Sequence, residues 1–247
     1  MRQQRLTFIY ICQIVFFFVM APAARATLTY QVSDGISTFT IADSGSGDLA
    51  VQAGAIVYTN SFGNVSLNVG TGISRPMIGS SGLPQQHLDS VIVSTGAVNL
   101  TIALSDTDFS GTGTANFLAS IGGIINSAPG STATYSVYRD LSNNLFGTGP
   151  GTLVCTTGPL SVGSIPFNIG GSCSAAPTID NAYSLTSVAN IHLLGPGSSS
   201  FDAVLVDAPE PASIILLGVG LIGAVTWSRR NARKSLLRST PGVFKQS

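Results

Sequence analysis

Few side chains in this 247-residue chain are suited to acid–base or nucleophilic chemistry. The two histidines, His87 and His192, lie far apart in sequence. A Ser-His-Asp site would need one of them beside a serine, and nothing in the sequence resembles a nucleophile elbow. His192 stands between Ile191 and Leu193, an alternation that indicates a strand residue facing solvent. We therefore predict no catalytic residue and no enzymatic activity.

Aspartate carboxylates are the remaining side chains that could bind a metal or take part in catalysis. Asp106-Thr107-Asp108 and the loop from Asp43 to Asp48 contain oxygen ligands of the kind that calcium prefers. The same Asp-Gly pattern is ordinary turn chemistry, so Asp106 and Asp108 are only weak calcium candidates and we expect no metal or other cofactor. The segment before Pro209 has no glutamate, and its aspartates lie mostly in turns, so no glycosidase-type carboxylate pair is predicted.

Two cysteines remain once the apolar N-terminal stretch that contains Cys12 is set aside. Cys155 and Cys173 are close in sequence and lack the paired spacing of a structural zinc site. In an exported chain this arrangement predicts a disulfide, because the compartment is oxidising.

Aromatic residues offer two alternatives. They can form a platform on which sugar rings stack, or they can fill the core as cross-strand pairs, which is the commoner role of alternating aromatics. The residues concerned are Tyr58, Phe62, Tyr135, Tyr138, Phe146 and Tyr183.

Charge is strongly segregated along the chain although the formal net charge is zero. Between Thr27 and Ala208 the only basic side chains are Arg75 and Arg139, and there is no lysine. The aspartates of this segment are Asp34, Asp43, Asp48, Asp89, Asp106, Asp108, Asp140, Asp180, Asp202 and Asp207. An acidic body without a basic stripe cannot neutralise phosphates, so we exclude nucleic acid as a partner.

The elements that must position these residues are strands. Val98, Leu100, Ile102 and Leu104 alternate with polar or small residues, the period of a half-buried strand, and we expect Leu88–Ser94 to be its hairpin partner through Thr95-Gly96. Leu118–Ile125 fits a strand or a short helix equally, and Gly70–Pro84 and Asn143–Gly151 are expected to be long surface loops. Further strands are expected at Leu28–Ser33, Ile36–Ala42, Ala50–Thr59, Val65–Val69, Thr132–Arg139, Thr152–Thr156, Tyr183–Leu194 and Ser200–Val206. Short strands separated by turn residues predict an all-β fold, a single antiparallel β-sandwich of jelly-roll or immunoglobulin-like type over residues 27–206.

Residues 1–26 have the layout of a secretory signal peptide. A basic start with Arg2 and Arg5 precedes an apolar stretch, and Ala24 and Ala26 form a small-x-small cleavage site. We expect the secretion translocon and signal peptidase to act on this segment.

The C-terminal part, residues 207–234, consists of an extended tripeptide, an apolar helix and a basic stop. Pro209 and Pro211 flank Glu210, residues 212–227 are predicted to form a transmembrane helix, and Arg229, Arg230, Arg233 and Lys234 follow within residues 229–234. The positive-inside rule places these cations in the cytoplasm and the body outside. Residues 235–247 form a short cytoplasmic tail.

This C-terminal pattern resembles the PEP-CTERM sorting signal of Gram-negative bacteria. The resemblance is confined to about the last forty residues and implies recognition by exosortase, a membrane protease that cuts near Pro209-Glu210-Pro211. It also implies an inner-membrane stage followed by delivery to the cell surface or beyond, in bacteria that make exopolysaccharide. An ordinary C-terminal membrane anchor is the alternative, and it would need no tripeptide.

Together these features predict an exported surface or matrix structural protein, with adhesion or exopolysaccharide binding as its more specific form. A secreted hydrolase acting on matrix polymers is the alternative from a different functional class.

Overall fold

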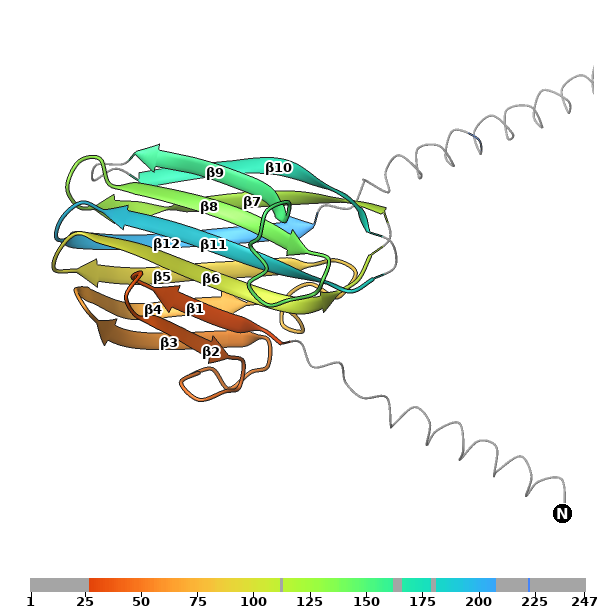
Figure 1. Ribbon diagram of the computed structural model, residues 1–247, viewed down its shortest axis with the longest axis horizontal. Coiled ribbons are helices and arrows are strands. Elements are labelled where there is room, and N and C mark those ends of the chain that lie inside the picture. The colour runs from red at the N-terminus through yellow and green to blue at the C-terminus, as the bar shows by residue number, and fades with distance from the viewer. Residues whose placement is uncertain (1–26, 112, 162–165, 179–180, 208–221, 223–247) are drawn as a thin grey trace, which may run out of the picture. The chain divides into compact units, whose positions relative to one another are not determined.

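The computed structural model describes residues 27–111, 113–161, 166–178, 181–207 and 222. The body is a sandwich of two six-stranded antiparallel sheets, which confirms the predicted fold class (Figure 1). Sheet A has the order β2-β1-β6-β11-β8-β9, with β1 Thr29–Ser33, β2 Thr38–Ala42, β6 Val98–Phe109, β8 Thr132–Asp140, β9 Leu153–Ser161 and β11 Tyr183–Leu193. Sheet B has the order β10-β7-β12-β5-β4-β3, with β3 Ala55–Phe62, β4 Val65–Ile73, β5 Gln85–Ser94, β7 Gly113–Asn126, β10 Pro166–Thr178 and β12 Gly197–Asp207.

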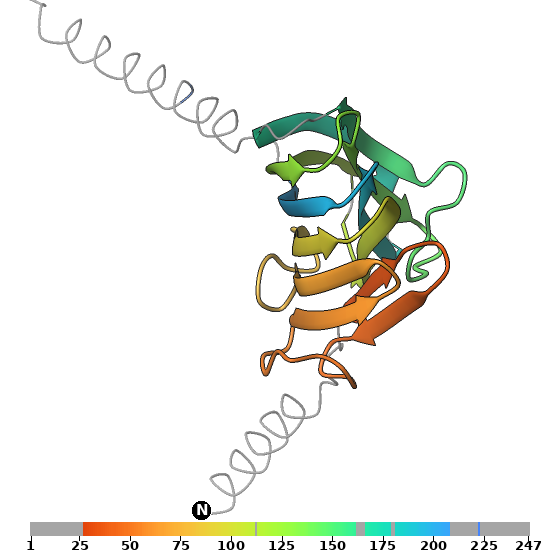
Figure 2. The same cartoon turned by 90° about the vertical axis from the view of Figure 1, so that its left-hand side faces the viewer.

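The two layers are seen edge-on in Figure 2, and the core lies between them. Along β5 every second side chain is buried, from Gln86 and Leu88 to Ile92, while His87 and Asp89 face away from the core. This alternation follows from the pleat, which sends successive side chains to opposite faces. The largest fully buried side chains come from both sheets and include Tyr30, Tyr135, Phe109 and Phe117.

The predicted hairpin between Leu88–Ser94 and Val98–Leu104 is wrong. β5 pairs with β4 and β12 in sheet B, whereas β6 pairs with β1 and β11 in sheet A. The chain crosses between the sheets at residues 95–97, where Thr95 N donates to Asn64 O at 2.9 Å. The alternation of apolar and polar residues shows which face of a strand is buried. It does not show which strand lies beside it, because the buried face of a strand does not depend on its pairing partner.

Several other boundaries differ from those predicted. The ambiguous segment Leu118–Ile125 belongs to strand β7, and β10 was not predicted at all. β4 continues to Ile73, so the expected loop Gly70–Pro84 shortens to residues 74–84, and Ser74 and Arg75 within it are buried. The remaining predicted strands all overlap observed ones, and β12 ends at Asp207 rather than at residue 206.

Both ends of the described body lie at one end of the sandwich. Thr29 pairs with Ser105 near the end of β6, and Val206 pairs with Gln85 at the start of β5. Since residues 95–97 join the other ends of β5 and β6, β1 begins and β12 ends on the same side, the right-hand side of Figure 1. Asp207 N donates to Pro84 O at 3.0 Å, so the last residue of β12 is held by the fold.

Candidate functional site

Asp106 and Asp108, the calcium candidates, have separate structural partners. Asp106 is fully buried, and its Oδ2 accepts hydrogen bonds from Ser74 Oγ at 2.8 Å and Arg75 Nε at 3.3 Å. Burial raises the pKa of the Asp106 carboxyl, and Arg75 and Ser74 oppose this rise by stabilising the charged form. Asp108 Oδ1 accepts from Asn143 Nδ2 at 2.7 Å, and its backbone φ is 59°. Within the described ranges, no three His, Cys, Asp or Glu side chains gather in a group that could hold a metal ion.

The two arginines of the body are interior residues. The Arg75 guanidinium lies 4.7 Å from the centre of the Phe109 ring, and that ring is 5.9 Å from the Tyr183 ring. Arg139 lies 5.7 Å from the Tyr183 ring. Both arginines are only 8% exposed, so the surface between residues 27 and 207 carries neither a lysine nor an exposed arginine.

Four of the six aromatic residues considered for a sugar platform belong to the core. Phe62, Tyr135 and Tyr183 are buried in the core, and Tyr58 packs against it with its ring 6.4 Å from that of Tyr30. The core alternative therefore holds for these four residues, whereas Tyr138 and Phe146 are partly exposed.

The two histidines lie on different sheets. His192 on β11 contacts Asn99 on the neighbouring strand β6 through Nδ1. His87 Nε2 on β5 lies 3.0 Å from Asp202 Oδ2 on β12, on the outer face of sheet B. Asp202 and the neighbouring Asp89 were not predicted as site residues.

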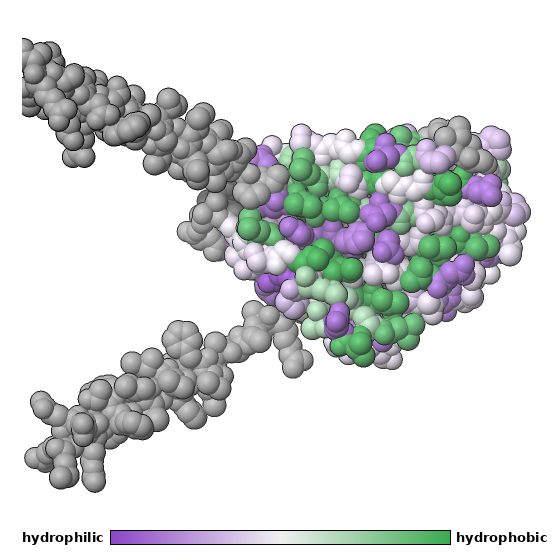
Figure 3. Space-filling model, turned by 180° about the vertical axis from the view of Figure 1, so that it is seen from behind, coloured by the Kyte–Doolittle hydropathy of each residue, from purple (hydrophilic) through white to green (hydrophobic). Residues whose placement is uncertain are grey.

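A row of polar positions crosses the outer face of sheet B. The strand register places Thr71 of β4 opposite Asp89 of β5, Asp89 opposite Asp202 of β12, Asp202 opposite Gly122 of β7, and Gly122 opposite Asn168 of β10. We call these five residues the sheet B row. Figure 3 shows this side of the sandwich, with hydrophilic residues across its middle and hydrophobic clusters around them.

A surface cavity of about 420 Å³ lies over the centre of the sheet B row, lined by Asp89, Ser90, Val91, Gly122, Gly123, Ser200, Phe201 and Asp202. Gly122 and Gly123 supply backbone without side chains at its floor. A Cβ on Gly122 would meet only ordinary contacts, the nearest being Phe167 O at 3.4 Å, whereas one on Gly123 would lie 2.1 Å from Ser200 O. Gly123 is therefore required by the packing, and Gly122 leaves room above the sheet.

The electrostatics of this cavity are set by its two carboxylates. Burial is the main cause that raises the pKa of Asp89, and the negative charge of Asp202 raises it further. A hydrogen bond from Thr71 and the nearby His87 act in the opposite direction. The site is thus acidic, partly desolvated and rich in hydrogen-bond acceptors.

A second cavity of about 320 Å³ lies at the end of the sandwich opposite Asp207. Its lining includes Asp34, Asn64, Asn99 and His192 beside Ile36 and Val98. Asp34 is engaged by its own turn, because its Oδ1 accepts from Ile36 N at 2.9 Å and Ser37 N at 2.7 Å. These bonds lower the pKa of Asp34.

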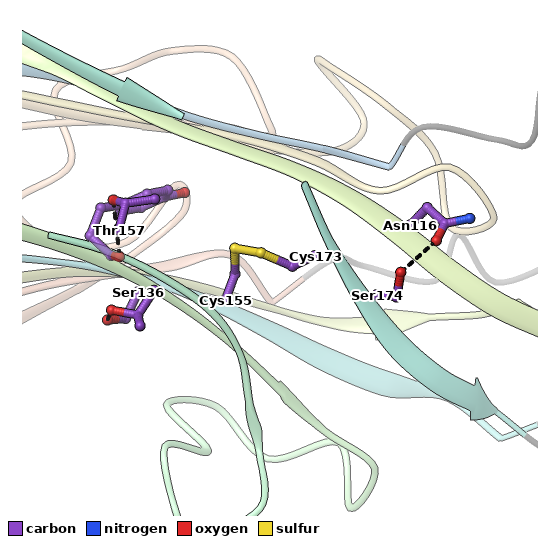
Figure 4. The surroundings of a disulfide bond; sticks show 8 residues. Asn116, Ser136, Cys155, Thr157, Cys173 and Ser174 are labelled. Carbon is purple, nitrogen blue, oxygen red and sulfur yellow. Dashed lines mark hydrogen bonds between the residues drawn. A yellow bond between two sulfur atoms is a disulfide. The ribbon is translucent and has the colours of Figure 1, made fainter. Parts of the chain in front are cut away.

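The predicted disulfide is confirmed. Cys155 on β9 is bonded to Cys173 on β10, with a Cα–Cα distance of 5.6 Å, and the bond joins the edge strands of the two sheets (Figure 4). The predicted cleavage residues Ala24 and Ala26, the tripeptide Pro209-Glu210-Pro211, the helix 212–227 and the basic stop lie outside the described residues, apart from Ile222. No helix among the residues that the structure describes combines the length and apolar character of a membrane span.

A family model of the PEP-CTERM protein-sorting motif matches residues 207–230. The chain therefore carries this motif, which marks an exported protein processed at the membrane and implies an exosortase as the processing enzyme. No curated protein matches the chain.

Similar solved structures include three from the carbohydrate-binding and adhesin fields. The first, CBM61 in complex with β-1,4-galactotriose, is 7% identical, with 66% of this chain and 92% of that chain covered and a TM-score of 0.31. The second is the C-terminal CBM6 of the laminarinase LamC from Zobellia galactanivorans, 11% identical over 61% and 91% of the two chains, with a TM-score of 0.25. The third is the K3 adhesin domain of Lys-gingipain from Porphyromonas gingivalis, 12% identical over 72% and 91%, with a TM-score of 0.29.

Proposed function

We propose that this exported protein is a non-catalytic surface or matrix protein whose sandwich binds a neutral exopolysaccharide on the outer face of sheet B. The observation that carries the proposal is the cavity over Asp89, Asp202 and Gly122. Signal cleavage after Ala26, temporary anchoring by residues 212–227 and cutting near Pro209-Glu210-Pro211 are the delivery route that we propose with it.

Recognition would depend on hydrogen bonds rather than on ring stacking. Carboxylates accept charge-assisted hydrogen bonds from hydroxyl groups, and Asp89 and Asp202 supply four carboxylate oxygens beside the hydroxyl of Thr71 and the amide of Asn168. The sheet B row covers five neighbouring strands, which at ~4.8 Å per strand spacing is about 19 Å from end to end. That length suits several residues of an extended polymer.

Charge selects the class of polymer. Because Arg75 and Arg139 are buried and the body has no lysine, the exposed charged side chains of the described body are acidic apart from its histidines. A polyuronate or sulfated polymer would be repelled by Asp89 and Asp202, whereas a neutral polymer would not.

The test compares the wild-type full-length chain in detergent with two valine variants on immobilised neutral glucans, galactans and mannans, and on alginate. Gly122→Val adds a side chain at the floor of the cavity, where its Cβ meets only ordinary contacts, and Gly149→Val, at an exposed loop glycine with open space, is the control. We expect binding to a neutral polymer that falls at least tenfold in Gly122→Val and is unchanged in Gly149→Val. Equal binding by all three proteins, or preference for alginate, would contradict the proposal.

A hydrolase is the second candidate, favoured by one observation. Asp89 and Asp202 lie directly opposite each other and the pKa of Asp89 is raised, as for a general acid beside a second carboxylate. Release of reducing ends from a bound polymer, abolished by Asp89→Asn, would replace the binding proposal with this one.

A further inference from the structure

Four strands form the edges of the two sheets, and three of them carry features that block pairing with another chain. β2 is only five residues long. β9 contains Pro159, which lacks a backbone N–H, and its register with β8 is interrupted twice. Short edges, prolines and bulges are the devices by which proteins prevent edge-to-edge association.

The third blocked edge, β3, is covered by the chain that precedes it. Leu49 N donates to Val57 O at 2.8 Å, and Asp48 Oδ1 accepts from Val57 N at 3.0 Å. Both hydrogen-bonding groups of Val57 are therefore occupied, and a bulge follows between Tyr58 and Asn60.

The edge strand β10 has none of these features over most of its length. It has 13 residues, and its register with β7 is uninterrupted from Pro166 to Ala175. It contains no charged residue, and its only prolines are Pro166 and Pro177 near the two ends. In the part of the chain that the structure describes, β10 pairs with β7 alone, so its other side presents backbone groups without a strand partner.

We propose that β10 is a self-association edge, along which β10 of one copy pairs antiparallel with β10 of a second copy. When a strand pairs antiparallel with its own copy, each residue near the two-fold axis lies beside the same residue of the partner, so a charge there would approach a like charge. β10 avoids this conflict. The middle of the strand, Gly170, Gly171 and Ser172, is exposed and small, which leaves room for the partner's side chains.

The disulfide prepares this edge for pairing. Cys173 in the middle part of β10 is bonded to Cys155 on β9, so the position of β10 is fixed by a covalent link to the other sheet already in the monomer. An edge that is already ordered loses less conformational entropy on association. Antiparallel pairing about an axis normal to the sheet keeps the two outer faces on the same side, so both sheet B rows lie on one surface.

The experiment measures the oligomeric state of the full-length chain in detergent by sedimentation velocity over a range of concentrations. We expect a dimer whose dissociation constant rises at least tenfold in Gly171→Lys, because two lysines are brought together at the pairing edge. Thr59→Lys, an exposed position on the blocked edge β3, is the matched control and should dimerise like the wild type. Ser172→Lys is the second variant if Gly171→Lys unfolds, as judged by circular dichroism.

Hydrogen exchange distinguishes a dimer that pairs along β10 from a dimer formed through another surface. Amides of β10 on the side away from β7 should exchange slowly in the dimer and rapidly in the lysine variants. A monomeric wild type, or a dimer that persists in both β10 variants with fast exchange along β10, would overturn the proposal. Neither result depends on polysaccharide binding, so this proposal and the proposed function can fail independently.

Discussion

At the scale of single residues, the outer face of sheet B keeps a costly arrangement. Asp89 and Asp202 lie directly opposite each other on the neighbouring strands β5 and β12. Like charges in such opposite positions destabilise a sheet. His87, 3.0 Å from Asp202, and the hydroxyl of Thr71 offset part of this cost. Sequence alone could not identify the pair, because Asp89 and Asp202 are more than a hundred residues apart and meet only through the register of β5 and β12.

The pKa of Asp89 provides the first prediction. Asp202→Asn removes the like charge, so the pKa of Asp89 should fall, and the fall should be limited because burial is the larger cause of its rise. Carbon-13 NMR titration of the Asp89 carboxyl measures this, with Asp34, at the far turn, as an internal control. A pKa of Asp89 that rises in Asp202→Asn would show that the assignment of charges is wrong.

The raised pKa of Asp89 also fixes the sign of a pH effect on stability. The folded protein holds the proton more tightly than the unfolded chain does, so stability falls as pH rises from about 3.8 through the folded-state pKa. Asp89→Asn removes this term, and its free energy of unfolding should decrease less than that of the wild type across the same pH interval. Urea unfolding at stepped pH values checks the difference.

The buried pair Arg75 and Asp106 gives a stability prediction. Asp106→Ala leaves the guanidinium of Arg75 without its carboxylate, and breaking a buried ion pair costs about 3–5 kcal/mol. The double variant Arg75→Met/Asp106→Leu removes both charges and should unfold at a urea concentration closer to that of the wild type. If the double variant were the less stable of the two, uncompensated charge would not be the cause.

At the scale of elements, alternation predicted most strands but not their neighbours. The period of two in Leu100, Ile102 and Leu104 predicts β6 correctly. The short connection after Ser94 is typical of a hairpin, but in the structure it crosses from one sheet to the other. β10 escaped prediction because Gly170-Gly171-Ser172-Cys173-Ser174 lacks the β-branched and aromatic residues that favour strands. The disulfide between Cys155 and Cys173 is predicted correctly, because an oxidising compartment and a short sequence separation can both be inferred from the sequence without knowledge of the fold.

The disulfide gives a prediction for the edge strands. Replacing both Cys155 and Cys173 with alanine should lower the free energy of unfolding by about 3 kcal/mol, from the chain-entropy model for a loop of this size. Denaturation of the double variant beside the reduced and oxidised wild type measures the change. On the opposite side of the sandwich, where the Phe39 and Phe62 rings are 4.9 Å apart, hydrogen exchange should accelerate only as far as global unfolding becomes more frequent, whereas the amides beside the lost disulfide should also exchange through local opening.

At the scale of the whole molecule, the sorting motif begins where the sandwich ends. The motif matches from Asp207, the last residue of β12, and Pro209 is two residues further on. At no more than ~3.6 Å per residue, the tripeptide begins within about 8 Å of the last strand. An enzyme that cuts near the tripeptide, as we propose, would therefore act within a few residues of a folded strand.

Replacing Pro209-Glu210-Pro211 with alanines should stop processing and leave membrane insertion intact, since the apolar run and the arginines are unchanged. Fractionated cells of a host with an exosortase should then hold the full-length variant in the membrane, while the wild type is shorter and further out. A wild type that stays full-length in the membrane would identify the C-terminus as a plain anchor.

The burial of both arginines has a consequence for survival outside the cell. Trypsin-like proteases cut after lysine or arginine, and between residues 27 and 207 they have only Arg75, which precedes a proline, and Arg139. Because Arg139 is 8% exposed within β8, cleavage there must await the opening of an interior strand of sheet A. The rate at which trypsin cuts the native body therefore reports how often this strand opens, and a protein built this way persists among proteases of that specificity for as long as it stays folded.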